Sequence, residues 1–130
     1  MKLTILGNAA GGSYQGRHYS GQFMEYGSYR FLIDCGEGTQ MQLYNLGVKN
    51  YPNVDAIFIS HLHGDHVFGL IGLLNSFSMM GRRKKLEIYA PVGVEKLIAV
   101  HKEVCDSYIA YPLIINEVDT NQHQIIFENK

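Results

Sequence analysis

Several features that would assign a chain to a specialised class of protein are scarce in this sequence. Only two cysteines and three prolines occur among 130 residues, and tryptophan is absent. Two cysteines exclude a disulfide framework of the kind that stabilises small secreted domains, and they suit a reducing compartment. With few prolines and no repeat or low-complexity tract, the sequence shows no linker or domain boundary. We therefore expect a single cytoplasmic domain over residues 1–130.

An excess of one charge and long apolar runs are also missing. The 11 basic residues nearly cancel the 12 acidic ones, so any contact with nucleic acid would need a local patch. No apolar stretch approaches the length of a bilayer crossing, and the short apolar run near the N-terminus is too brief for a signal peptide. These absences predict a soluble protein with no membrane partner.

Strand-like and helix-like segments alternate along the chain. Strands are predicted at residues 2–7, 22–27, 29–35, 54–60, 85–90, 112–119 and 122–129, with turns at 27–28 and 120–121. Helices are predicted at residues 39–46, 67–80 and 91–106. The second helix is apolar almost all round and is expected to be buried, and the third is amphipathic with Pro91 near its start. The combination favours a mixed sheet covered by helices, an α/β (α+β) fold.

The segment His-Leu-His-Gly-Asp-His, residues 61–66, joins a predicted strand to a predicted helix. Alternate residues of an extended segment point the same way, so His61 and His63 can converge on one ion. Asp65 and His66 come after the turn at the intervening glycine and can address a second ion. Imidazole nitrogen and carboxylate oxygen suit zinc, with manganese or iron as alternatives. Burying four such groups without a ligand would be costly, so we predict a metal site.

This motif resembles the signature of hydrolases with the metallo-β-lactamase fold. Residues 31–43, 57–74 and 86–98 together resemble ribonuclease Z, the endonuclease that trims the 3′ end of precursor transfer RNA. The resemblance extends from about residue 5 to residue 119 and implies an αββα sandwich. This chain would supply the N-terminal half of the sandwich, with a mixed sheet.

The resemblance also implies a role for each residue of the motif. His61 and His63 would ligate one zinc ion, and Asp65 and His66 the other, with manganese as an alternative metal. Asp65 would also accept the proton of the water that attacks the phosphodiester. Asp34, at the end of a predicted core strand, would orient either one of the ligands or the region of Asp65. Precursor transfer RNA is the implied partner, and the relatives are generally homodimers.

The chain departs from the family downstream of the motif. Ribonucleases Z supply a further histidine, an aspartate and a last histidine, together with an arm that grips transfer RNA, beyond the point that matches Lys130. His101 and His123 do not match these ligands by position and are predicted to be surface or packing residues, the latter in a strand. We therefore expect a C-terminally truncated domain that is inactive alone. Its uncovered sheet edge and apolar face would favour a homodimer.

Two other functions remain open from the sequence. The first is another hydrolase of the same fold, acting on small phosphodiesters, sulfate esters or a cyclic nucleotide. The second is an inactive assembly module that lacks the remaining metal ligands.

Weaker candidates lie outside the motif. Arg17 and His18 lie in the first loop, residues 7–21, and are candidates for contacting a substrate phosphate. The basic run at residues 81–85 is another candidate for binding RNA phosphates, although a solvated turn is the preferred interpretation. Cys35, next to Asp34, is predicted to be a buried structural thiol in preference to a soft metal ligand.

Overall fold

The structure is a computed structural model that describes residues 1–12, 16–47, 53–119, 121–126 and 128. Its strands are β1 (Lys2–Gly7), β2 (Gly21–Tyr26), β3 (Tyr29–Ile33), β4 (Ala56–Phe58), β5 (Leu86–Pro91) and β6 (Leu113–Val118). Its helices are α1 (Thr39–Asn45), α2 (Gly64–Val67), α3 (Leu70–Met79) and α4 (Val94–Val104). No helix in these ranges is long and apolar enough to cross a membrane.

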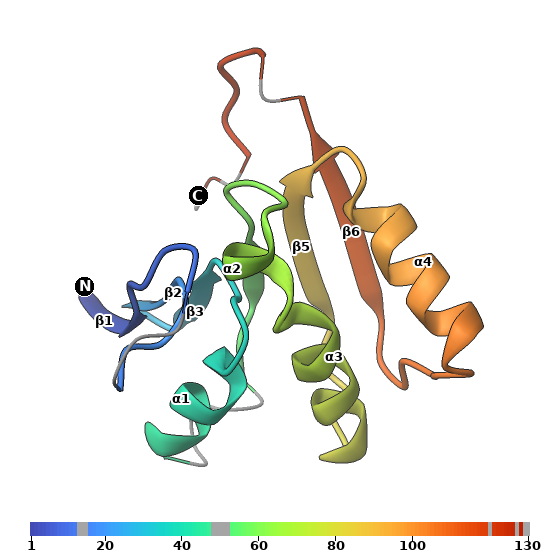
Figure 1. The fold of residues 1–130 in the computed structure, drawn as a ribbon, viewed down its shortest axis with the longest axis horizontal. Coiled ribbons are helices and arrows are strands. Elements are labelled where there is room, and N and C mark those ends of the chain that lie inside the picture. Colours follow the sequence, from blue (N-terminus) through green and yellow to red (C-terminus); the bar gives the residue numbers. More distant parts are fainter. Residues whose placement is uncertain (13–15, 48–52, 120, 127, 129–130) are drawn as a thin grey trace.

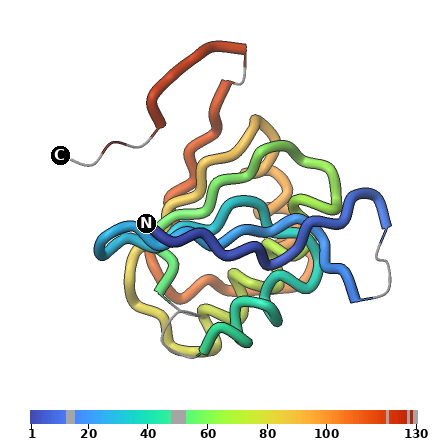
Figure 2. The backbone as a smooth tube through the Cα atoms, turned by 90° about the vertical axis from the view of Figure 1, so that its left-hand side faces the viewer, coloured from blue at the N-terminus to red at the C-terminus, as the bar shows by residue number. Residues whose placement is uncertain are grey.

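The six strands form one mixed sheet in the order of the sequence (Figure 1). The strands β1, β2 and β3 pair antiparallel, and β3 to β6 pair parallel. The predicted hairpin is confirmed, because Tyr26 pairs with Tyr29 across a two-residue turn in which Gly27 has a φ of 58°. β1 lies at one edge of the sheet, nearest the viewer in Figure 2. The prediction of a mixed sheet with helices is therefore correct.

The core lies between one face of the sheet and the helices. Phe23, Leu32, Ile57 and Ile88 occupy neighbouring positions across β2 to β5 and are completely buried. They share one apolar cluster with buried leucines, valines and isoleucines of α1, α3 and α4. Because side chains alternate along a strand, this single row of residues places all three helices on the same face.

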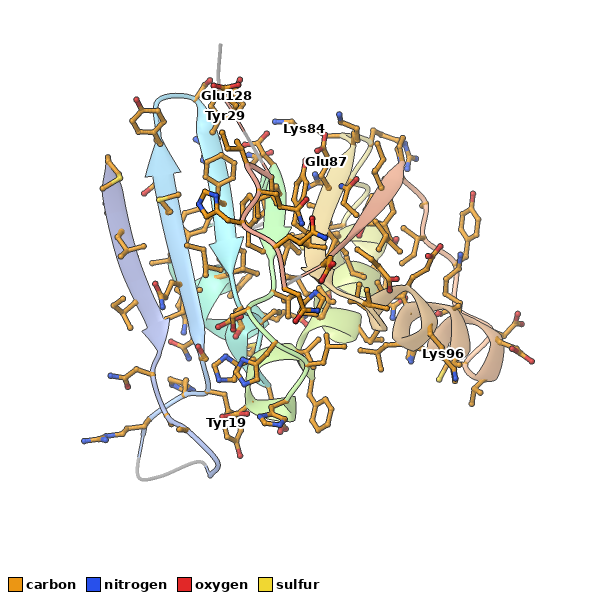
Figure 3. The ribbon with its side chains drawn as sticks, turned by 90° about the horizontal axis from the view of Figure 1, so that it is seen from above. Tyr19, Tyr29, Lys84, Glu87, Lys96 and Glu128 are labelled. Carbon is orange, nitrogen blue, oxygen red and sulfur yellow. The ribbon has the colours of Figure 1, made fainter. Side chains whose placement is uncertain are left out.

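The opposite face carries a row of aromatic rings. Ring centroids lie 5.9 Å apart for Tyr29 and Phe31, 5.6 Å for Phe31 and Phe58, and 5.2 Å for Phe58 and Tyr89, within the range of favourable aromatic pairs. Tyr29 is labelled at the end of this row in Figure 3. The row links β3, β4 and β5 on the face that the helices do not cover.

The predicted helix at residues 67–80 is interrupted. The chain forms α2 and then α3, with a break at Phe68 and Gly69. The Gly69 amide donates to the Cys35 carbonyl at 2.9 Å, and a Cβ at position 69 would lie only 2.1 Å from the Gly36 carbonyl oxygen. This contact with the loop after β3 sets the path of the chain. Burial on all sides was also a wrong expectation, because Phe68 and Met79 are exposed.

Two further predictions of local structure are wrong. Pro91 is the last residue of β5, and Gly93, with a φ of 112°, leads into α4. The chain after β6 forms no strand in its described part, residues 121–126 and 128, so His123 lies outside any strand. The Asn121 amide donates to Asp119 Oδ1 at 2.9 Å, a local turn that takes the chain out of β6. Thr120, in the predicted turn, lies outside the described residues.

The basic run is only partly solvated. Arg82 is 4% exposed, and its guanidinium carbon lies 5.2 Å from the ring centroid of Phe77 and 5.3 Å from that of Tyr111. Lys84 and Lys85 are exposed but pair with neighbouring carboxylates. The expectation of a simple solvated turn is therefore wrong for Arg82, whose side chain belongs to the packed interior.

Candidate metal centre

The four predicted ligands lie between the end of β4 and the first turn of α2. His63 is the N-cap residue of α2 with extended dihedral angles, φ −66° and ψ 148°. His61 and His63 therefore belong to the segment that enters the helix, whereas Asp65 and His66 lie in its first turn. The predicted change from extended to helical backbone within the motif is confirmed.

These side chains gather around His61. The His61 ring centroid lies 4.8 Å from that of His63 and 4.0 Å from that of His66. His66 Nε2 lies 3.6 Å from Asp65 Oδ2. The His61 ring therefore adjoins the rings of His63 and His66, and Asp65 lies beside His66.

Asp34 holds His66 from behind. Its Oδ2 lies 2.7 Å from His66 Nδ1, and because an ionised carboxylate only accepts, Nδ1 carries the proton that is shared. The same carboxylate accepts the Ser60 amide at 2.8 Å, the Ser60 hydroxyl at 3.0 Å and the Ser20 hydroxyl at 3.2 Å. Asp34 is buried and has a φ of 58°, a left-handed conformation that aspartate tolerates. This arrangement leaves His66 Nε2 facing Asp65, as a carboxylate–histidine pair does behind a bound metal.

Asp65 is held as a carboxylate by the first loop. Its Oδ2 accepts the Gly11 amide at 3.1 Å, and its carbonyl accepts the Ser20 amide at 3.1 Å. The Gly11 hydrogen bond is the main cause that lowers the pKa of Asp65, and His66 and His61 lower it further. A Cβ at Gly36 would lie 2.3 Å from the Asp65 carbonyl oxygen, so the close approach of the two loops requires glycine there.

Cys35 is a structural thiol, as predicted. It is completely buried, and its amide donates to the His66 carbonyl at 2.7 Å. Burial raises the pKa of the Cys35 thiol, and the neighbouring Asp34 carboxylate raises it further. A group that resists forming a thiolate is a poor metal ligand, so the backbone of Cys35 positions His66 while its side chain fills the core.

The remaining histidines lie apart from the motif. His101 in α4 has its Nε2 3.2 Å from Asn75 Nδ2 of α3, so it is the packing residue that was predicted. His18 Nε2 lies 2.9 Å from Gln42 Nε2 of α1. Arg17 and His18 line a hollow of about 220 Å³ together with Tyr19, Glu37 and Gly38.

Sequence reasoning did not find several residues of the site. Ser20, Ser60 and Gly11 bind the two carboxylates, and Tyr19 and Phe68 line a hollow next to Asp65. Ser60 directly precedes the motif, which was a usable signal. Gly11, Tyr19 and Ser20 gave no such signal in the sequence, because only the tertiary fold brings the first loop to α2.

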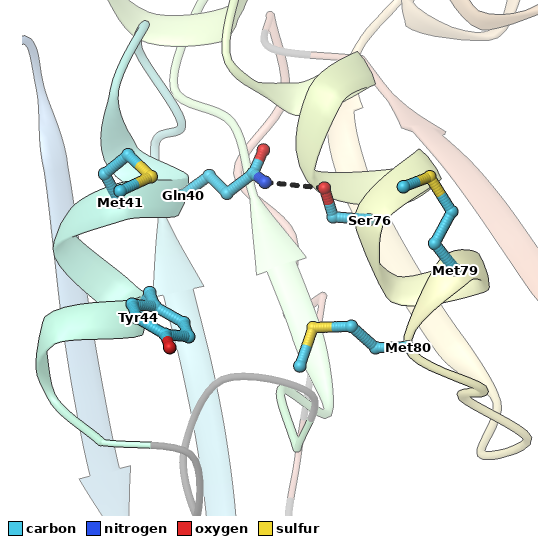
Figure 4. Close-up of a pocket in the computed structure, with 6 residues that line it drawn as sticks. All are labelled: Gln40, Met41, Tyr44, Ser76, Met79 and Met80. Carbon is cyan, nitrogen blue, oxygen red and sulfur yellow. Dashed lines mark hydrogen bonds between the residues drawn. The ribbon is translucent and has the colours of Figure 1, made fainter.

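Another hollow, of about 300 Å³, lies between α1 and α3 (Figure 4). Gln40 and Ser76 join its two walls through a hydrogen bond of 2.5 Å. Its other lining residues are Met41, Tyr44, Met79 and Met80. None of the predicted ligands lies in it, so we assign it no part in the metal centre.

The donor set fits a metal only in part. Imidazole nitrogens, a carboxylate of lowered pKa and a buried aspartate behind one histidine suit zinc. Across the described ranges, however, no group of three or more His, Cys, Asp or Glu side chains is arranged to hold an ion. A zinc site usually takes three or four protein ligands, so these residues fit as part of a coordination shell.

Comparison with known proteins identifies the family. The family model described as anti-Pycsar protein Apyc1 matches residues 1–102, more than three quarters of the chain. The chain belongs to this family. Ribonuclease Z from Bacteroides fragilis is 41% identical over 115 residues, covering 88% of this chain and 38% of that protein. Ribonuclease Z from Enterococcus faecalis is 38% identical over 133 residues, covering 100% of this chain and 42% of that protein. The chain spans about two fifths of the length of these relatives.

Solved structures agree with the similarity to ribonuclease Z and show the fold. The crystal structure of the short form of human tRNase Z superposes with a TM-score of 0.83 at 34% identity, covering 94% of this chain and 48% of that one. YhfI from Bacillus subtilis, a metallo-β-lactamase fold protein, gives 0.66 at 24% identity, with coverage of 88% and 45%. The second comparison shows the fold alone. The predicted resemblance to the N-terminal portion of ribonuclease Z, with a metallo-β-lactamase fold, is confirmed.

Proposed function

We propose that this chain carries part of the active site of a zinc-dependent phosphodiester hydrolase of the ribonuclease Z type. Its substrate would be precursor transfer RNA, from which it removes the 3′ trailer. The observation that supports this proposal is the hydrogen bond of 2.7 Å from His66 to the buried Asp34, which directs His66 toward Asp65 in a chain homologous to ribonuclease Z.

In this proposal each residue has one task. His61 and His63 would hold one zinc ion, and Asp65 and His66 would hold the other. Zinc, when bound, supplies a Lewis acid that lowers the pKa of water and stabilises developing negative charge. Asp65 would accept the proton of the attacking water. Its lowered pKa means that it is already a carboxylate at neutral pH, as a ligand and a proton acceptor must be.

A homodimer is also part of the proposal. Leu3 and Ile5 of the edge strand β1 are each at least half exposed, and they lie on the sheet face that the helices leave open. Burying such residues against a second copy would remove apolar surface from water and cover an open strand edge. Sedimentation velocity measures the mass of the protein in solution. A single sedimenting species with the mass of a monomer at micromolar concentration would contradict the proposed homodimer.

A second candidate function is hydrolysis of a small phosphodiester. One observation favours it over RNA processing, namely that the basic run at residues 81–85 is not an open phosphate-binding patch. Arg82 in that run is buried, and Lys84 and Lys85 pair with carboxylates.

A chimeric enzyme tests both candidates. Residues 1–130 replace the matching part of Enterococcus faecalis ribonuclease Z, and the chimera is assayed on a 3′-extended precursor transfer RNA with zinc or manganese. We expect cleavage that is lost in the His61→Ala and Asp65→Asn variants and kept in His123→Ala, a histidine outside the motif. Cleavage of a cyclic nucleotide without cleavage of the RNA would refute the first candidate and support the second.

The isolated chain provides a complementary test. Because two ligands leave each ion under-coordinated, we expect weak zinc binding and no turnover by the chain alone. Tight binding of two zinc ions together with hydrolysis would contradict this expectation. A folded, zinc-bound chimera that cleaves neither substrate would favour the assembly module over both enzymes.

A further inference from the structure

Phe68 exposes most of an aromatic ring to solvent beside the candidate metal centre. It comes directly after α2, and 70% of the residue is exposed. A single exposed apolar side chain is common on protein surfaces and would not by itself indicate a ligand. The contact of its ring with Gly64 and the residues that line the adjacent hollow provide the further observations.

The ring is seated against Gly64. The Phe68 amide donates to the Gly64 carbonyl at 3.0 Å, and a Cβ at position 64 would lie 2.3 Å from Phe68 Cε2 and 2.5 Å from Cδ2. Any other side chain at position 64 would displace the ring. Contact with the backbone on one side restricts the ring, which leaves less conformational freedom to lose when a ligand binds.

The hollow beside the ring has aromatic and acidic walls. Its volume is about 270 Å³, and it is lined by Gly11, Tyr19, Glu37, Gly64, Asp65 and Phe68. Tyr19, labelled in Figure 3, belongs to the first loop, whereas Phe68 comes after α2. The hollow shares Tyr19 and Glu37 with the neighbouring hollow that contains Arg17 and His18. Asp65 lines one of these neighbouring hollows and Arg17 lines the other.

The charges that line the hollow beside Phe68 determine which kind of chemical group fits there. Two carboxylates, Asp65 and Glu37, would repel a phosphate placed between them. A neutral, planar group with N–H donors suits the same walls, since carboxylates accept hydrogen bonds from the amino groups of bases. Aromatic rings bind the faces of such groups by stacking, largely independent of base identity.

We infer that Phe68 and Tyr19 form the walls of a nucleobase-binding subsite, in which Phe68 is the stacking residue. The substrate would then be a nucleotide phosphodiester and not a simple alkyl ester, with a base next to Asp65. This inference rests on the proposed function for the phosphodiester chemistry, whereas base binding by the subsite requires no metal.

Binding of two matched ligands tests the inference on the metal-free chain. Adenosine 5′-monophosphate and ribose 5-phosphate differ only by the base, and their weak binding can be followed from amide shifts of the labelled chain at millimolar ligand. We expect the nucleotide to bind about tenfold more tightly, as one stacked base provides. Stacking on Phe68 would also shift the adenine H2 and H8 resonances upfield, a signature that a merely structural role would not produce.

Variants separate stacking from other causes. Phe68→Leu is expected to bring the affinity for the nucleotide down to that for ribose 5-phosphate, and Phe68→Trp is expected to keep the preference. Tyr108→Leu removes an aromatic side chain that is 79% exposed elsewhere on the surface and should change nothing. Unchanged amide spectra of the free variants away from residue 68 would show that each remains folded.

Two results would overturn the inference. One is equal affinity of the original chain for the two ligands, and the other is an unaltered preference in Phe68→Leu. Neither depends on zinc or on cleavage by the chimera. A chimera without hydrolytic activity would therefore refute the proposed function while leaving the base-binding result as it stands.

Discussion

Arg82 connects the turn after α3 to the end of the loop before β4, and replacing it with leucine removes every polar contact of its guanidinium. The Nη2 atom donates to the Val54 carbonyl at 2.8 Å and to the Lys85 carbonyl at 2.7 Å, and Nε donates to the Lys84 carbonyl at 2.8 Å. The side chain is 4% exposed, so water cannot easily replace these donors. Leucine would also lose the contact of the guanidinium with the Phe77 ring, and it would leave the three carbonyls without their present donor.

The expected loss can be worked out from these contacts. Each hydrogen bond from a charged donor contributes about 1.5 kcal/mol at the low end of its range. Part of this loss is returned, because the variant no longer buries a charge, whose cost is reflected in the lowered pKa of Arg82. We therefore expect Arg82→Leu to lower the free energy of unfolding by about 3 kcal/mol. That is a large share of the roughly 5–15 kcal/mol typical of small domains.

Urea unfolding followed by circular dichroism measures this difference. Arg83→Leu is the matched control, because Arg83 is the adjacent arginine and is exposed. We expect the control to change the unfolding free energy by less than about 0.5 kcal/mol. Arg82→Leu should lower the urea midpoint by about 2 M for a typical slope. Equal urea midpoints for the two variants would refute this reasoning and support the interpretation of the basic run as a solvated turn.

Three other changes are predicted for the site and its supports. Asp34→Asn should weaken zinc binding about 10- to 100-fold, measured by competition with a chelator, because the amide removes the negative charge next to His66 Nδ1. Asp106→Asn is the control, because Asp106 also has a positive φ, and it should leave zinc binding unchanged. Gly69→Ala should destabilise by about 2 kcal/mol in thermal unfolding, because its Cβ meets the backbone, whereas Gly72→Ala should be neutral or stabilising. The pKa of Asp65, measured by carbon NMR, should lie below 3.8. Its contribution to stability is then present at neutral pH and lost on acidification through that lowered pKa, and a midpoint above 3.8 would contradict the assigned hydrogen bonds.

Local patterns predicted well those parts of the fold that local interactions decide. The turn at Gly27 and the helix that precedes Gly47 depend on backbone freedom within a few residues, and both were found. The interruption at Gly69 depends on the carbonyls of residues 35 and 36, more than thirty positions away. Periodicity in residues 67–80 could not reveal it, because a helix pattern does not record which backbone passes alongside.

The same division applies to the basic run and the end of the chain. A run of four cations suggests solvent exposure, but the burial of Arg82 depends on the carbonyl of Val54 and the rings on either side. The apolar residues after Asn121 suggest a strand, but the Asn121 amide donates to the Asp119 side chain, and this local turn takes the chain out of β6. The error at the basic run concerned a partner distant in the sequence, whereas the error at the end of the chain concerned a local hydrogen bond of a side chain.

At the candidate metal centre, the sequence alone determined the identity and order of His61, His63, Asp65 and His66. It did so because an extended segment that enters a helix places those side chains near one another whatever the remainder of the fold. Only the tertiary structure decided how they are held. Asp34, 32 residues before His66, and Gly11, 54 residues before Asp65, reach the motif through hydrogen bonds that close long loops. The spacing of residues along a chain cannot reveal these bonds, because their formation depends on how the sheet and helices pack.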